Sequence, residues 1–271
     1  FNLMFKTHLG PVEEGGMEIY LRPETAQGIY VNFKNVVQTS RVKIPFGIAQ
    51  VGKAFRNEIT TKNFIFRTCE FEQMEMQFFI HPKEDVKWFD YWREERWKYY
   101  LNLGIREEKL RWHQHGPGEL AHYAKDAYDI EYEFPFGWKE LEGVHNRTDY
   151  DLKRHGEFTG KEINYLDDQT SERYIPYVIE TSAGLTRTVL TVLSDAYDED
   201  TADGETRSVL RFHPKIAPVT VAVFPLVKKD GLADLARDVE ASLREHFSTF
   251  YDQSGAIGRR YRRQDEAGTP Y

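Results

Sequence analysis

The sequence predicts an α+β domain built on an antiparallel sheet, followed by the beginning of a second domain of α/β type. Most of the first part of the chain consists of short strands separated by turns and then a helix, an order typical of antiparallel sheets. Near Ala217 and Pro218 the pattern changes to a continuous apolar strand followed by a helix, which is typical of a parallel β-α unit. We therefore expect two domains, at residues 1–216 and 217–271.

The composition is that of a globular protein. The chain has 271 residues, of which 40% are hydrophobic and 14% aromatic, so it can form a core. No apolar run approaches the roughly 18 to 20 residues of a membrane helix. A single cysteine, Cys69, excludes an internal disulfide and favours a reducing, cytoplasmic setting. The net charge of −8 argues against indiscriminate nucleic-acid coating and leaves local basic patches, such as the arginines in 259–263.

The first 80 residues contain two strand-like runs, Gln50–Glu58 and Phe71–Ile80. In the second run Gln73, Glu75 and Gln77 alternate with apolar residues, so one face of the strand is polar. We expect this polar face to meet a ligand or solvent.

The following elements are predicted from changes of hydrophobic period. An apolar stripe predicts a long surface helix from Pro82 to Gly104, in which tryptophans serve packing. The next elements are strands at Tyr128–Phe134, Gly137–Gly143 and Tyr174–Ser182, loops over Asp149–Asp168, a helix over Leu185–Tyr197, a strand over Val219–Val227 and a helix from Leu232 to Leu243.

The first chemical constellation is Arg56 and Glu58, followed by a loop and by Arg67 and Phe71. On a strand, Arg56 and Glu58 would share a face, and a hairpin would return Arg67 and Phe71 beside them. An arginine can grip a phosphate, a carboxylate can accept from an adenine amino group, and a phenyl ring can stack on a purine. A surface ion pair between Arg56 and Glu58 is an equally good interpretation.

The second constellation is Glu180–Arg187, in which a carboxylate at a strand end precedes small residues and an arginine in the first turn of a helix. Small residues allow close backbone approach, and a helix N-terminus favours anions. Taken alone, this string is more typical of an ordinary strand-to-helix turn.

The two constellations together resemble motifs 2 and 3 of the class II aminoacyl-tRNA synthetases. Longer strings are similar to those of the dimeric, single-polypeptide glycyl-tRNA synthetases: Phe1–Phe5, Tyr20–Gly28, Phe71–Glu75, Asn146–Leu152 and Tyr261–Glu266. The resemblance covers the whole chain. It implies a class II catalytic core with flanking helices and then the start of an α/β anticodon-binding domain.

The resemblance also implies the site residues. Arg56 and Arg187 would be catalytic, holding the phosphates of ATP. The implied ATP contacts are Arg56, Asn57, Glu58, Phe66, Arg67, Thr68, Cys69, Glu70, Phe71, Glu140, Leu141, Gly184, Leu185, Thr186 and Arg187. The implied glycine contacts are Glu24, Phe71, Glu72, Gln73, Met74, Glu75, Glu180, Thr181, Ser182, Ala183 and Gly184. Glu140 would orient Mg²⁺ through ATP.

By the same resemblance, the partners are glycine, ATP, tRNA(Gly) and a second copy in a homodimer, with no membrane. Several carboxylates around one ammonium suit a substrate without a side chain. Because clustered glutamates repel one another, one of them is expected to be partly protonated in the empty site. Motif 1 would lie before Phe1 and the anticodon-binding domain would continue beyond Tyr271, so the activity and dimerisation of the chain as given stay open.

Two alternatives remain at this point. A non-catalytic relative, such as a polymerase accessory subunit, would bind nucleic acid with the same fold, and a synthetase for another amino acid would share both motifs. Cys69 is expected to be a small loop residue, and His113, His115 and His122 are expected to be solvated loop residues. The arginines in 259–263 fit either RNA contact or a solvated turn equally well.

Overall fold

The computed structural model describes residues 2–11, 15–202 and 204–271, so Phe1 of the first motif string lies outside the described residues. The chain divides into two compact units. The first comprises Phe1–Lys98 and Glu107–Thr191, and the second comprises Tyr99–Arg106 and Val192–Tyr271. None of the described helices has the length and apolarity that a membrane span requires.

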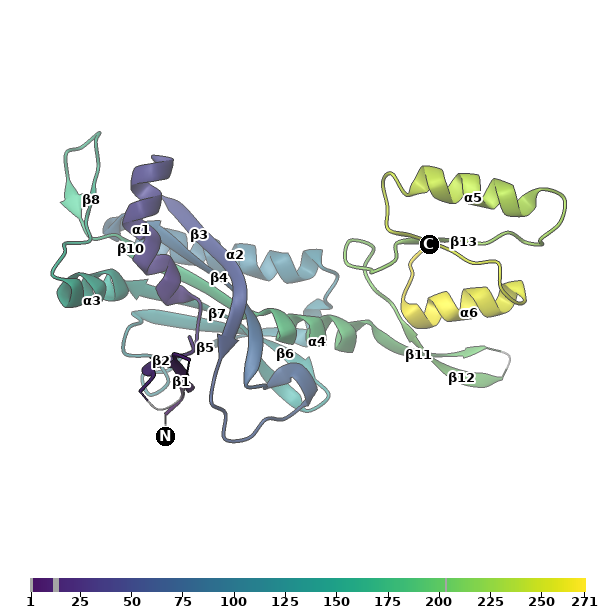
Figure 1. Ribbon diagram of the computed structural model, residues 1–271, viewed down its shortest axis with the longest axis horizontal. Coiled ribbons are helices and arrows are strands. Elements are labelled where there is room, and N and C mark those ends of the chain that lie inside the picture. The colour runs from purple at the N-terminus through teal and green to yellow at the C-terminus, as the bar shows by residue number, and fades with distance from the viewer. Residues whose placement is uncertain (1, 12–14, 203) are drawn as a thin grey trace. The chain divides into compact units, whose positions relative to one another are not determined.

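A six-stranded antiparallel sheet forms the centre of the first unit (Figure 1). Its strands, in spatial order, are β3 (Phe46–Phe55), β4 (Glu70–Ile80), β10 (Tyr177–Gly184), β7 (Gly137–Thr148), β6 (Asp126–Phe134) and β5 (Leu110–Gln114). A separate hairpin joins β1 (Lys6–Leu9) to β2 (Met17–Tyr20). The predicted α+β class with an antiparallel sheet is confirmed.

One face of the sheet is apolar and is covered by α2 (Asp85–Asn102). Phe78 of β4 packs against Trp88 and Trp92, with ring centroids 5.0 and 5.2 Å apart. Trp97 stacks on Trp112 of β5 at 5.5 Å. The predicted long helix and its packing role for the tryptophans are confirmed.

The opposite face changes character along the strands. At one end Phe79 and Val178 pack under α1 (Ala26–Ser40) and α3 (Tyr150–Thr159), which cover this part of the face (Figure 1). Toward the other end of β4 the same face carries Gln77, Glu75 and Gln73, all of which are buried. The polar face expected for this strand is therefore present, and it is turned inward.

Two expectations for the first unit were wrong. Residues Asp149–Asp168 were expected to be loops, but they contain α3 and the short strand β8 (Tyr165–Leu166), which pairs with β9 (Arg173–Tyr174). Leu152 is fully buried against α1, and Asp151 is paired with Arg147, so a largely polar segment still has an inward face. The second error concerns β3, which ends at Phe55, so Arg56 and Glu58 lie in the segment after the strand.

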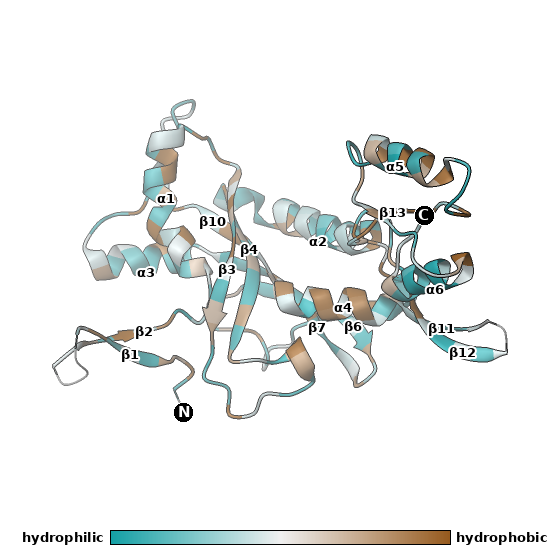
Figure 2. Cartoon of the chain, turned by 45° about the vertical axis from the view of Figure 1, so that its right-hand side comes forward, coloured by the Kyte–Doolittle hydropathy of each residue, from teal (hydrophilic) through white to brown (hydrophobic). Residues whose placement is uncertain are grey.

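Helix α4 (Leu185–Ala196) leads from the first unit into the second, and its apolar residues show as brown segments in Figure 2. A hairpin of β11 (Tyr197–Ala202) and β12 (Glu205–Leu210) follows. The remaining elements are β13 (Val221–Val223), α5 (Leu232–Leu243), β14 (Thr249–Tyr251) and α6 (Ile257–Ala267).

Strands β13 and β14 pair in parallel, which confirms the α/β pattern predicted for this region. The predicted strand Val219–Val227 is much shorter than expected, because prolines at 218 and 225 flank β13 and cannot donate ladder hydrogen bonds. The arginines in 259–263, which were expected in a turn or an RNA contact, lie on α6.

Candidate functional site

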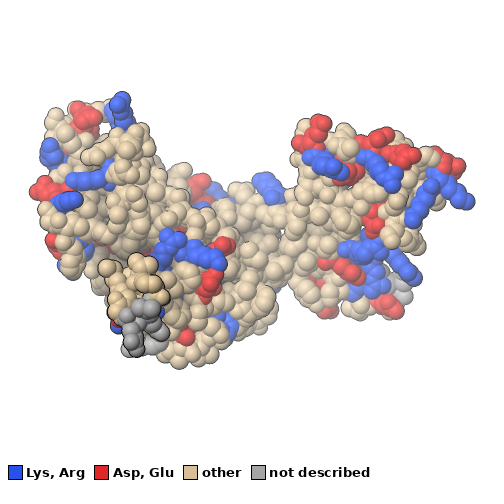
Figure 3. Space-filling view, viewed as in Figure 1, with Lys and Arg blue, Asp and Glu red and all other residues tan. Residues whose placement is uncertain are grey.

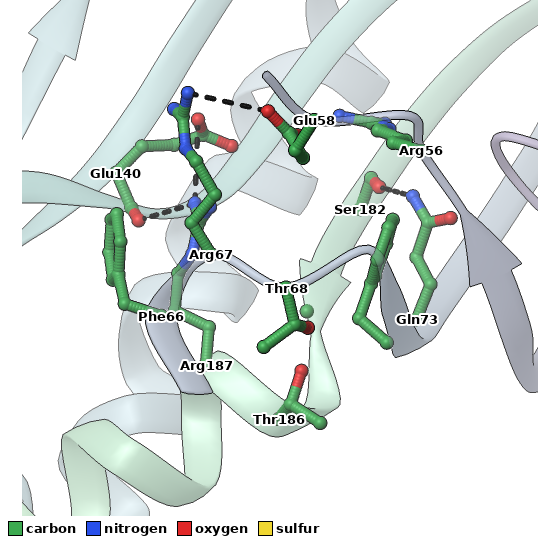
Figure 4. Close-up of a pocket in the computed structure, with 12 residues that line it drawn as sticks. Arg56, Glu58, Phe66, Arg67, Thr68, Gln73, Glu140, Ser182, Thr186 and Arg187 are labelled. Carbon is green, nitrogen blue, oxygen red and sulfur yellow. Dashed lines mark hydrogen bonds and ion pairs between the residues drawn. The ribbon is translucent and has the colours of Figure 1, made fainter. Parts of the chain in front are cut away.

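A pocket opens on the polar face of the sheet, where β4, β7, β10 and the segment after β3 approach the start of α4 (Figure 4). It is lined by Arg56, Glu58, Phe66, Arg67, Thr68, Phe71, Gln73, Glu140, Ser182, Gly184, Thr186 and Arg187. All twelve belong to the residues singled out from the sequence. They come from segments more than a hundred positions apart, and the antiparallel order β4-β10-β7 brings them together.

Arg187 stands in the first turn of α4 on one side of the pocket. Its Nη1 donates to the carbonyl oxygen of Glu140 at 2.8 Å and lies 3.5 Å from Glu140 Oε2. The guanidinium also lies over the ring of Phe66, 4.2 Å from its centroid. These contacts hold the cation near a helix N-terminus, where an anionic ligand is favoured.

Arg56 stands on the opposite side, near the end of β3. Its Nε donates to the carbonyl oxygen of Pro23 at 3.0 Å, and its guanidinium lies 5.4 Å from the centroid of the Phe71 ring. Glu58 does not pair with Arg56, as the alternative interpretation proposed, but with Arg67 at 3.6 Å. Arg56 therefore faces the pocket without a carboxylate partner among the described residues.

The inner wall of the pocket is formed by Gln73 and Ser182, which lie side by side in Figure 4. Gln73 Nε2 donates to Ser182 Oγ at 2.7 Å. The strand register places Glu75 opposite Ser182 and Gln77 opposite Glu180, one and two rows further along the same face. Two carboxylates, Glu75 and Glu180, are thus buried directly behind the wall.

Glu180 is an ionised carboxylate held from several sides. Arg147 Nη1 donates to both of its oxygens at 2.9 and 3.1 Å, and Gln77 Nε2 donates to Oε2 at 2.6 Å. His145 Nδ1 lies 2.7 Å from Oε1. Burial by itself would raise the pKa of Glu180, but the charge of Arg147 and the hydrogen bond with His145 lower it to about 2.

The pKa of Glu75 is shifted in the opposite direction. Burial, and then the negative charge of Glu180, raise its pKa to about 8, although a hydrogen bond from Thr25 opposes the shift. Thr25 donates to Glu75 Oε2 from its backbone nitrogen at 3.0 Å and from its hydroxyl. At neutral pH one carboxyl of the pair is therefore protonated and the other charged, in agreement with the expectation from clustered glutamates.

Arg147 was not among the residues predicted for the site, although its string, Asn146–Leu152, was noted. Its Nε and Nη2 donate to Asp151 at 2.8 and 2.9 Å, so its guanidinium bridges α3 and β10. Arg147 follows His145 by two positions, so alternation along β7 puts both side chains on the face of Glu180, and a β-bulge shifts the register with β10 beside Arg147. Such a bulge cannot be read from the local sequence.

The other predicted residues lie around the pocket without lining it. Because side chains alternate along strands, Glu72, Met74, Thr181 and Ala183 point to the face opposite Gln73 and Ser182. Glu24 precedes α1 and accepts from Gln27 Nε2 at 3.0 Å. The remaining residues are Asn57, Cys69 and Glu70 in the chain around the lining residues, Leu141 buried in β7, and Leu185 at the start of α4. Glu180 lies within β10, which runs to Gly184, rather than at a strand end.

Of the three histidines that were expected to be solvated loop residues, His122 is exposed and lies in a turn, as expected, whereas His113 lies in a strand and His115 is partly buried. His113 lies in β5, His115 Nε2 is 2.8 Å from Asp129 Oδ2, and His122 Nε2 is 3.1 Å from the hydroxyl of Tyr150. No cluster suited to a metal ion occurs among the residues that the structure describes.

The arginines of α6 do not form an open basic patch. Arg260 is buried, with Nη1 donating to Pro225 O at 2.5 Å and Nη2 to Gly255 O at 3.0 Å. Arg262 pairs with Glu266, and Arg263 pairs with Asp252. Figure 3 shows acidic and basic side chains interspersed over the visible face of the unit that carries the C-terminus.

Comparison with family models gives two matches. Residues 5–196 match the tRNA synthetase class II core domain (G, H, P, S and T), and residues 220–271 match the anticodon binding domain.

Comparison with curated proteins gives relatives that align with the whole chain. The glycine–tRNA ligase of Treponema denticola is 68% identical over 277 residues, covering 61% of that protein. The glycine–tRNA ligase of Borreliella afzelii is 63% identical over 275 residues, covering 62% of it. That of Treponema pallidum is 59% identical over 297 residues, covering 64% of it. The chain thus spans about six tenths of the length of these relatives.

Proposed function

The chain belongs to the class II tRNA synthetase core family, and from this premise we propose that the full-length protein attaches glycine to tRNA(Gly) in an ATP-dependent reaction. The observation that supports the proposal most strongly is that two regions of different chemistry lie next to each other on one face of the sheet. An arginine-lined pocket that suits a nucleotide adjoins a buried carboxyl pair that suits a small ammonium. The similarity to glycine–tRNA ligases supports the choice of amino acid.

The pocket accounts for ATP binding. Arg56 and Arg187 approach from opposite sides and carry guanidinium donors suited to phosphate oxygens. Phe71 provides an aromatic face for the purine, and Glu58 provides an acceptor for its amino group. Glu140 at the rim is an oxygen ligand of the kind that Mg²⁺ takes together with substrate phosphates. The ion would help to neutralise phosphate charge, and the arginines hold the phosphates in place.

The buried carboxyl pair accounts for the selection of glycine. A substrate ammonium that passes Gln73 and Ser182 meets Glu180, which is charged, and Glu75, which can lose its proton as the cation arrives. One extra methyl group changes binding through attraction by only about 1 to 3 kcal/mol, so rejection of alanine must come from steric exclusion beside the α-carbon. The closely packed wall of Gln73 and Ser182 is suited to such exclusion.

The reaction follows from positioning and charge neutralisation. A glycine carboxylate oxygen attacks the α-phosphorus of ATP, the bond to the bridging oxygen breaks, and pyrophosphate leaves. The terminal hydroxyl of the tRNA then attacks the carbonyl carbon of glycyl-adenylate, loses its proton, and AMP leaves. Arg56 and Arg187 stabilise the charge on the phosphates, and no protein nucleophile is required. Cys69 therefore has no part in the chemistry.

The same proposal covers the remaining assignments. The protein works as a homodimer, its catalytic core comprises residues 1–216, and residues 217–271 form part of a domain that contacts the anticodon. The match of residues 220–271 to the anticodon binding domain supports the last assignment.

The test is glycine-dependent exchange of pyrophosphate into ATP by the full-length protein, with alanine, serine, proline and threonine in parallel. Exchange with glycine alone is expected, and Glu180→Ala should abolish it. Exchange with a different amino acid would overturn the choice of substrate. A folded protein that exchanges with none of them would overturn the enzymatic proposal and favour a nucleic-acid-binding relative.

A further inference from the structure

His145 of β7 lies in the row next to the pocket wall, directly opposite Glu180 of β10. Its Nδ1 is 2.7 Å from Glu180 Oε1, and the two side chains are 16% and 3% exposed. Because Glu180 is ionised and can only accept, Nδ1 carries the proton of this hydrogen bond. The proton that the imidazole can lose is therefore the one on Nε2.

The position of the imidazole ring is constrained by the backbone of its own strand. A Cβ atom on Gly143 would lie 2.8 Å from Cε1 and 2.9 Å from Nε2 of His145, so a side chain there would force the ring to move. The same point lies 3.4 Å from Asp129 Oδ1. Glycine at position 143 thus allows the ring to pack between Glu180 on one side and Asp129 on the other.

Charged and titratable groups from every neighbouring element face this ring. They are Glu180 from β10, Arg147 from β7, Asp129 from β6, His115 after β5 at 6.1 Å between ring centroids, and Tyr123 at 6.5 Å. Burial lowers the pKa of His145, but Glu180 and Asp129 together outweigh burial and the repulsion from Arg147, so the pKa is raised. The two carboxylates thus favour the imidazolium more than water does around a solvated histidine.

We infer that His145 is a positioning residue of the amino-acid subsite, which orients Glu180 through Nδ1 and whose Nε2 proton weakens the attraction of Glu180 for an ammonium ion. The inference rests on the proposed function, because it takes Glu180 as a contact of the substrate ammonium. Arg147 and Gln77 also hold Glu180, but of these three partners only His145 has a side chain of the type that ordinarily changes its charge near neutral pH. Loss of the Nε2 proton removes a cation beside the subsite and keeps the hydrogen bond that orients Glu180.

The test compares the KM for glycine and the KM for ATP in pyrophosphate exchange by the full-length protein, between about pH 6 and 8.5. The variants are His145→Ala, which loses both the hydrogen bond and the charge, and His145→Asn, which places an amide donor near the position of Nδ1 but cannot be charged. His113→Ala, on the outer strand β5, is the matched control. Thermal melts show whether each variant is folded.

We expect the lost hydrogen bond to outweigh the lost charge, so that His145→Ala raises the KM for glycine about tenfold, while the KM for ATP changes by less than about twofold. In the wild type the KM for glycine should fall as pH rises, and His145→Asn should remove part of this dependence. The part that remains belongs to Glu75.

An unchanged KM for glycine in folded His145→Ala, or a full wild-type pH profile in His145→Asn, would overturn this inference and leave the proposed function intact. If His145→Ala does not fold, the pH profile of His145→Asn decides. Absence of glycine-dependent exchange in the wild type would overturn the proposed function and this inference with it.

Discussion

The open pocket and the buried carboxyl pair share one face of the sheet, but they hold their arginines in different ways. In the pocket, Arg56 and Arg187 are held by backbone carbonyl oxygens and aromatic rings, together with one contact of 3.5 Å between Arg187 and Glu140. In the buried region, Arg147 donates four hydrogen bonds to the carboxylates of Asp151 and Glu180.

This difference separates two uses of the same side chain. An arginine whose donors are filled by protein carboxylates balances charge and fixes geometry, because it has little capacity left for a ligand. An arginine held by carbonyl oxygens and rings keeps its charge and part of its donor set for an incoming anion. Four predictions test this distinction.

The largest effect is expected for Arg147→Ala, which leaves Glu180 and Asp151 buried without their cation. Removing one partner of a buried ion pair destabilises a protein by about 3 to 5 kcal/mol. Chemical denaturation should show a loss of this size in the free energy of unfolding. Arg154→Ala, which removes an exposed pair with Glu157 on the same helix, should change it by less than about 0.5 kcal/mol. Equal effects of the two substitutions would contradict the structural role of Arg147.

Arg187→Ala should have the opposite effects, with a large loss of activity and a small loss of stability. We expect the rate of glycine-dependent pyrophosphate exchange to fall by about 10² to 10³, as for the loss of one preorganised charge in an active site. The free energy of unfolding should change by no more than about 1 kcal/mol, because the lost contacts lie at the pocket rim. Exchange kinetics and denaturation of the same preparation check this. A variant that is strongly destabilised but retains exchange would reverse the comparison.

Glu75 should give the protein a stability that depends on pH. Its pKa is about 8 in the folded state and about 4.5 in the unfolded state, so the folded state binds more protons between these values. The contribution of Glu75 is therefore fully present below about pH 4.5 and is lost as pH rises through 8, at up to about 1.4 kcal/mol per pH unit.

The substitution Glu75→Gln tests this, because an amide cannot ionise and can still accept from Thr25. Melting curves of both proteins between pH 5.5 and 8.5 should show the variant gaining stability relative to the wild type as pH rises. A difference that is independent of pH would mean that Glu75 is ionised throughout.

The smallest effect is expected in the second unit, where a buried and an exposed arginine are neighbours. Arg260 is buried with its guanidinium donating to two carbonyl oxygens, and its neighbour Arg259 is exposed. Arg260→Ala should lower the free energy of unfolding by about 1 to 3 kcal/mol, and Arg259→Ala should change it by less than about 0.5 kcal/mol. Similar values for both would show that the buried contacts of Arg260 contribute little.

Local pattern predicted much of this molecule. Alternation along β4 predicted a polar face with Gln73, Glu75 and Gln77, and the apolar stripe from Pro82 to Gly104 predicted the long helix that the structure shows as α2. Both features are local, because the repeats of strands and helices are set by covalent geometry. The motifs around Arg56 and Arg187 were equally visible, since each lies within a short string.

Other features depend on contacts between distant segments. Helix α3 forms in a charged segment because Leu152 packs against α1, which lies more than a hundred positions earlier in the chain. The alternation from which β4 was predicted also turns Glu72 and Met74 away from the pocket, although they belong to the same string as Gln73.

No local pattern of the sequence predicts which carboxyl of the pair is charged. The sequence shows several glutamates but does not distinguish Glu75, which is protonated at neutral pH, from Glu180, which is charged. That distinction arises because folding buries both carboxyls and pairs only Glu180 with Arg147 and His145. Residue types and their spacing set which groups are available, whereas protonation depends on distance and burial, which exist only once the strands have paired.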